Sequence, residues 1–168
     1  MRRSLALLVV LLVSSLAVSA DKFESKDGKY AVGFPKAPTD VVKEADTASG
    51  KVKLYISSVE IRREFAVLVL YADYPKEILK EKPQSILDRI RDGVKGQQGK
   101  VSDEKALTIG ANKVPGKTFV IEKMGFFMRN RVYLDGVRIY QVYVMASKKE
   151  DLMSKEADEF LDSFEIKK

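Results

Sequence analysis

The stretch FFMRNRVYLDGVRIYQVYVM, residues 126–145, determines how this 168-residue chain is expected to fold. Two runs rich in aromatic and β-branched residues flank Asp135-Gly136, a dipeptide that favours a two-residue type I′ turn. The sequence therefore predicts a β-hairpin in which Leu134 lies opposite Val137.

This register sorts the side chains of the hairpin onto two faces. The first face is apolar and is expected to be core, with Asn130 opposite Gln141 as its polar pair. The second face carries Arg129, Arg131, Arg138, Tyr133 and Tyr140. Guanidinium groups bind carboxylate, phosphate or sulfate, and tyrosine rings support them as flat platforms. We interpret these five residues as a candidate binding site for an anionic ligand. The alternative is a half-exposed sheet face whose arginines pair with nearby acidic residues.

Outside the hairpin, alternating or continuous apolar runs predict further strands at 28–34, 52–56, 65–71, 101–109 and 117–122. The segment 65–71 is apolar on both sides, which is typical of a central strand covered on both faces. We expect turns at 47–50 and at Pro115-Gly116, because glycine and proline interrupt the pattern there.

Two segments have the spacing of amphipathic helices. The first begins at Pro83 and ends at Gly96, with an apolar stripe of Ile86, Leu87, Ile90 and Val94. The second is expected to begin with a capping box of Ser147 and Glu150. Its apolar stripe consists of Met153, Ala157, Phe160 and Leu161. The order strands, helix, strands, helix predicts one α+β domain over residues 21–168, an antiparallel β-sheet with helices packed on it.

Residues 1–20 have the features of an export signal. Arg2 and Arg3 form a positive start, an apolar run follows, and Val18-Ser19-Ala20 supplies the small residues that a signal peptidase requires. The apolar run is shorter than the roughly 20 residues that cross a bilayer. We therefore expect cleavage near Ala20 and a periplasmic or secreted protein with no transmembrane span after cleavage.

Three groups of residues resemble positions in a known family. They are Phe23…Gly28-x-Tyr30-x-Val32-x-Phe34-Pro35-x-x-Pro38, Tyr71-x-Asp73-x-Pro75 and the closing Phe160-Leu161-Asp162-Ser163-Phe164. In this spacing the chain is similar to the PsbP-like domains of exported bacterial proteins. The resemblance implies an α/β/α sandwich. Relatives of that fold include an extrinsic subunit of photosystem II and a Ran-binding transport factor, which implies binding and accessory roles.

The composition excludes several common kinds of catalytic site. The chain has no histidine and no cysteine, so a Ser-His-Asp triad, a thiol nucleophile and a His/Cys zinc site are all excluded. Residues 111–118 fit a relaxed P-loop pattern, but Pro115 removes a backbone N–H and a strand-like run follows. We interpret that segment as a turn between strands. The acidic residues of the last helix are interpreted as a solvated face. These are Glu150, Asp151, Glu156, Asp158, Glu159 and Asp162.

These observations favour a non-catalytic accessory or binding domain of the cell envelope, without a cofactor or metal. The expected partner is an envelope protein or an anionic ligand, and the domain is expected to be a monomer. The net charge of +6 is too low for a typical nucleic-acid-binding protein. Two alternatives stay open at this point. One is a hydrolase that uses carboxylates on an extracytoplasmic substrate, and the other is a protein that binds polyanions or anionic surfaces.

Overall fold

The computed structural model describes residues 22–47 and 50–168, so the predicted export signal lies outside the described residues. Seven strands form one antiparallel sheet in the order β3-β4-β5-β9-β8-β7-β6. Their bounds are β3 (Thr39–Thr47), β4 (Gly50–Arg62), β5 (Phe65–Asp73), β6 (Lys100–Ile109), β7 (Val114–Lys123), β8 (Phe126–Asp135) and β9 (Arg138–Ala146). A second, three-stranded sheet has the order β1-β2-β10 and consists of β1 (Phe23–Ser25), β2 (Tyr30–Val32) and β10 (Glu165–Ile166).

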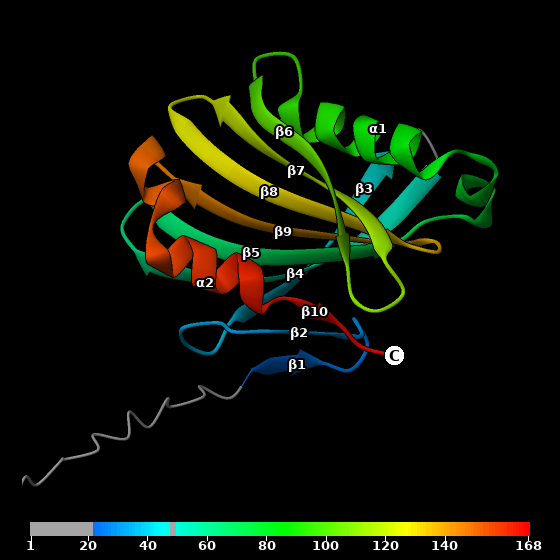
Figure 1. The fold of residues 1–168 in the computed structure, drawn as a ribbon, viewed down its shortest axis with the longest axis horizontal. Helices are drawn as coiled ribbons and strands as arrows, with labels where there is room; N and C mark the ends of the chain where they lie inside the picture. Colours follow the sequence, from blue (N-terminus) through cyan, green and yellow to red (C-terminus); the bar gives the residue numbers. More distant parts are fainter. Residues whose placement is uncertain (1–21, 48–49) are drawn as a thin grey trace, which may run out of the picture.

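The helix α1 and the small sheet lie on opposite faces of the large sheet (Figure 1). One face packs against α1 (Pro83–Lys95) and the short 3-10 helix η1 (Lys76–Lys80). The other face packs against the small sheet, α2 (Lys155–Ser163) and the 3-10 helix η2 (Lys149–Met153). Both faces therefore bury apolar side chains, and the large sheet separates two hydrophobic cores.

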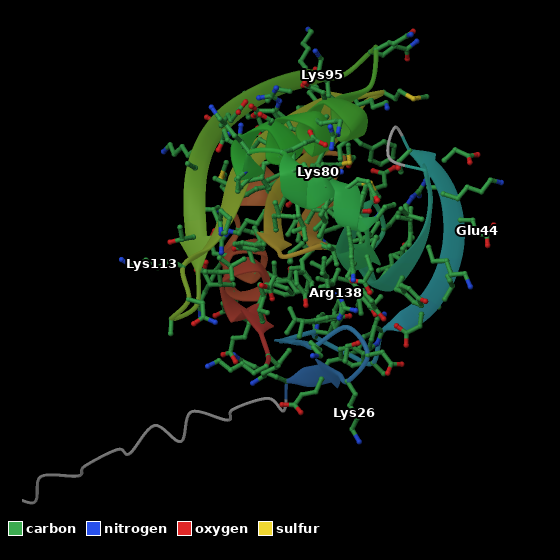
Figure 2. All side chains as sticks on the ribbon, turned by 90° about the vertical axis from the view of Figure 1, so that its right-hand side faces the viewer. Lys26, Glu44, Lys80, Lys95, Lys113 and Arg138 are labelled. Atoms are coloured by element: carbon green, nitrogen blue, oxygen red, sulfur yellow. The ribbon has the colours of Figure 1, made fainter. Side chains whose placement is uncertain are left out.

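The large sheet is bent around α1. In Figure 2, Lys113 marks the side formed by β6 and β7, Glu44 marks the side formed by β3 and β4, and α1 lies between them. The helix packs mainly on β7 and β8. The remaining part of this face, over β3, β4 and β5, is less completely covered.

The α+β assignment is wrong, and so is the α/β/α sandwich implied by the resemblance. Over the described residues the chain is mostly β, with ten strands in two sheets and two α-helices. The face that a sandwich would cover with helices alone is covered largely by β1, β2 and β10. The sequence pattern also missed β3, whose residues are mostly exposed and include four charged side chains among nine, so that they lack the apolar alternation of a half-buried strand.

The central hairpin forms as predicted, but its register differs by two residues. Asp135 pairs with Arg138, so the loop is Gly136-Val137. Gly136 has a φ of +61°, and the first loop position is where type II′ turns require glycine. A shift of two residues leaves every side chain on the face that the sequence assigned to it.

A buried lysine holds α1 against the β6–β7 side of the sheet. The Lys117 side chain is almost fully buried, and its Nζ forms ion pairs with Asp88 of α1 and Glu104 of β6. Arg91 of α1 adds a second ion pair to Glu104, with 2.7 Å between the nitrogen and the oxygen. Lys117 lies within β7, which begins at Val114, so the turn expected over residues 111–118 covers only the start of that segment and the turn expected at Pro115-Gly116 is wrong.

The last helix begins later than the sequence predicts. Its N-cap is Ser154, whose Oγ accepts a hydrogen bond from the Ala157 N–H, so the predicted capping box at Ser147 is wrong. Residues 149–153 form η2 instead, and Met153 is exposed. None of the helices in the described parts of the chain is long and apolar enough to cross a membrane.

Candidate functional site

Two of the predicted site residues connect the large sheet to α2. Arg129 forms an ion pair with Asp158 at 2.6 Å, and Arg131 forms one with Asp162 at 2.7 Å. Each guanidinium also donates to a backbone carbonyl at 3.0 Å, Arg129 to that of Leu152 and Arg131 to that of Leu161. The acidic residues that looked like a solvated helix face therefore include the partners of these arginines.

Tyr133 and Tyr140 belong to the core beneath the small sheet, and Arg138 lies partly buried at the edge of that core. Arg138 binds the Asp73 carboxylate through two hydrogen bonds of 2.6 Å. Tyr133 and Tyr140 are 3% and 1% exposed, and the Tyr140 hydroxyl donates to the Gly28 carbonyl at 2.8 Å. The alternative prediction that the three arginines pair with acidic residues is confirmed. Its half-exposed face is wrong, because the small sheet and α2 cover this side of the hairpin. Anion binding by these five residues stays a prediction, and it would require each arginine to leave an aspartate.

The pairing of Arg138 with Asp73 predicts a defined pH dependence of stability. The guanidinium lowers the pKa of Asp73 below its ordinary value of 3.8. A lowered pKa in the folded state contributes stability above the ordinary pKa, and this contribution is lost as the pH falls through the folded value. We expect Asp73→Asn to lower Tm at pH 7 and the difference from wild type to vanish at acidic pH.

Thermal melts of both proteins between pH 7 and pH 2 measure this effect. The control is Asp46→Asn, because Asp46 is exposed and lies 3.8 Å from its lysine partner. A Tm difference for Asp73→Asn that stays constant over this range would contradict the assignment.

The other face of the sheet contains a cavity of about 410 Å³. It lies between α1 and the β3–β4 side of the bent sheet, the side marked by Glu44 in Figure 2. Most of its lining is apolar and comes from Leu54, Leu70, Ile78, Ile86, Ile90 and Val94. Pockets of roughly 300–1,000 Å³ with mainly apolar walls are typical of small-molecule binding sites.

Few polar side chains reach this cavity. Gln141 of β9 is 8% exposed, lines the cavity and donates from Nε2 to the Oδ1 of Asn130 at 2.9 Å. Tyr74 also lines it, and burial raises the pKa of its hydroxyl, which therefore stays protonated at neutral pH. An apolar cavity with a few fixed polar groups can orient a ligand as well as hold it.

The two charged residues at the cavity differ in their pairing. Arg89 of α1 is held by Glu81, whose two oxygens accept hydrogen bonds of 2.7 and 3.0 Å. This pairing lowers the pKa of Glu81, so the carboxylate stays ionised and compensates the guanidinium. Asp46 on β3 is largely exposed and contributes a negative charge at the edge of the cavity.

Sequence comparisons do not assign the chain to a family. No protein-family model matches it, and the curated proteins contain no match. The resemblance to PsbP-like domains therefore stays a prediction. Over the described residues, no group of three or more acidic side chains is arranged to hold a metal ion.

The sequence contained one signal for the cavity. Gln141 and Asn130 stand out as polar residues on the apolar face of the hairpin, and they do form a buried pair. The walls could not be predicted, because one of them is β3, which the pattern missed, and the other depends on where α1 packs.

Proposed function

We propose that the protein is a non-catalytic binding domain of the cell envelope that holds a small apolar ligand between α1 and the β3–β4 side of the sheet. Export is supported by the predicted signal at residues 1–20. The observation that carries the proposal is the cavity of about 410 Å³ with its mainly apolar lining. Filling such a space with an apolar molecule removes apolar surface of both partners from water, which is the main driving force for binding.

One residue of α1 allows the proposal to be tested without disturbing the core. Gly93 lines the cavity, and a Cβ built there would meet nothing within 4 Å. A large side chain at this position can therefore extend into the empty space. The helix itself should tolerate the change, because glycine is a poor helix former in a helix interior.

We expect wild type to bind the fluorescent probe N-phenyl-1-naphthylamine with a blue shift and an increase in emission. Gly93→Phe should weaken this binding at least tenfold, because the ring occupies the volume that the probe needs. Fluorescence titration measures both affinities. The matched control is Ser85→Phe, which adds the same ring to an exposed position of α1 outside the cavity lining.

Melting curves of all three proteins show whether the variants are folded. If wild type does not bind the probe, or if the folded Gly93→Phe protein binds it as wild type does, the cavity is not a binding site and the proposal fails.

A further inference from the structure

The direction of the Gln141 amide is determined by a chain of hydrogen bonds. Asn130 is fully buried, and its Nδ2 donates to the Met128 carbonyl at 3.1 Å. Its Oδ1 is therefore the acceptor that faces Gln141, and it accepts from Gln141 Nε2 at 2.9 Å. One N–H of the Gln141 amide is used in this way, so its Oε1 is the acceptor that remains, beside the second N–H.

This oxygen is accessible and has no protein donor within the part of the chain that the structure describes. Every side-chain polar atom that is completely buried there has a hydrogen-bond partner. The hydrogen bond that Gln141 forms there is the one from Nε2, so Oε1 keeps some accessible surface, and the cavity is a space that Gln141 lines. A residue that is more than nine-tenths buried thus presents an open acceptor to an apolar space. A ligand that fits this acceptor carries a hydrogen-bond donor.

The charges around the cavity favour a neutral ligand over an anionic one. Glu81 already compensates the guanidinium of Arg89 through two hydrogen bonds. Asp46 is negative, and Gln141 presents an oxygen with partial negative charge. A carboxylate would meet both of these groups and would have to displace Glu81 to gain a cation.

A strip of incompletely covered apolar side chains runs along the sheet next to the cavity. On β5, Phe65, Val67, Val69 and Tyr71 are buried beneath the small sheet and α2, whereas Ala66, Leu68 and Leu70 on the opposite side are only half-buried. The neighbouring side chains Ile56, Tyr143 and Met145 share this face and are also half-buried. The four-residue step from Leu70 to Ala66 corresponds to roughly 13 Å of strand. The strip therefore has the shape of an extended chain.

We infer that the ligand is a neutral, linear aliphatic molecule with a hydroxyl group, such as a long-chain alcohol. Its hydroxyl donates to Gln141 Oε1, and its chain fills the cavity and follows the half-buried strip. This inference rests on the proposed function and specifies the class of molecule that the same cavity takes.

Displacement of N-phenyl-1-naphthylamine by three compounds that share a ten-carbon chain tests the inference. We expect 1-decanol to displace the probe at about fivefold lower concentration than 1-methoxydecane, which has no donor. The methyl ether is the more apolar compound, so burial alone would favour it over the alcohol. Decanoate should compete less well than decanol, because the cavity has no uncompensated cation among its described lining residues.

Gln141→Met should abolish the preference for the alcohol while probe binding persists. The single change leaves the buried Asn130 Oδ1 without its donor, which can destabilise the protein. The double variant Asn130→Leu/Gln141→Met removes both partners of this hydrogen bond, and it replaces the single variant if that one is unstable. Equal competition by decanol and its methyl ether, stronger competition by decanoate, or a preference that survives in the folded variant would each overturn the inference. Those results would leave the proposed function intact, whereas absence of probe binding to wild type would overturn both.

Discussion

Phe160→Ala is expected to lower the free energy of unfolding by about 3–5 kcal/mol, the range for removal of a fully buried aromatic ring. Phe160 is 3% exposed and lies on α2, with its ring centroid 5.4 Å from that of Phe34. Its loss would leave a void between the last helix and the segment after β2. Because a domain of this size has about 5–15 kcal/mol of total stability, the variant should be close to unfolding at physiological temperature.

Urea unfolding at equilibrium measures this effect, and Phe126→Ala is the matched control. Phe126 is 38% exposed at the start of β8, so the same change of side chain should cost clearly less there. Phe160→Leu keeps most of the apolar volume and should fall between the two. Equal midpoints for Phe160→Ala and wild type would show that α2 is not part of the cooperative core.

Gly116→Ala is expected to destabilise the protein by about 3 kcal/mol, the upper end of the usual range for overpacking. Gly116 lies within β7 opposite Tyr133. A Cβ built at this position would be 2.6 Å from the Val132 carbonyl oxygen and 2.6 Å from the Tyr133 ring. The oxygen belongs to the backbone of the neighbouring strand, so the clash cannot be relieved by rotating a side chain.

The control for this prediction is the same substitution in open space. Gly93→Ala adds a methyl group that meets nothing within 4 Å, and it replaces glycine by the best helix former in a helix interior. We expect it to stabilise the protein by about 0.5–1 kcal/mol. A lower urea midpoint for Gly116→Ala and a higher one for Gly93→Ala would confirm that the first position is crowded and the second is open. A stable Gly116→Ala protein would show that β7 and β8 can separate at this point.

The parts of the fold that the sequence predicted correctly are those with a strong local pattern. The stripe from Ile86 to Val94 forms α1, which begins at Pro83 and is followed by Gly96 with a φ of +61°. Phe160 and Phe164 are buried as expected, because packing against the sheet removes their rings from water. Gly136 predicts the hairpin correctly. The strand register is wrong by two residues because the sequence favoured Asp135-Gly136 as the loop, whereas the loop is Gly136-Val137.

The parts that could not be predicted depend on contacts between distant segments. Arg129 and Arg131 alternate with apolar residues, which is typical of an exposed face. They are instead covered by α2, which carries their partners Asp158 and Asp162. These partners lie about 30 residues further along the chain, so no local pattern announces them. Gly116 looked like a turn residue, although its role is to let two strands and a tyrosine ring approach closely. Neither role is visible until the partner segment is in place.

The position of β10 has a consequence for the order in which the chain can fold. β2 pairs on one side with β1 and on the other with β10, whose residues Glu165 and Ile166 lie opposite Ala31 and Tyr30. Synthesis proceeds from the N-terminus, so more than a hundred residues must be made after β2 before it can pair with β10. Contacts of such long sequence separation also form slowly, because a large loop must close first. The nascent chain therefore remains incompletely folded until β10 has been made.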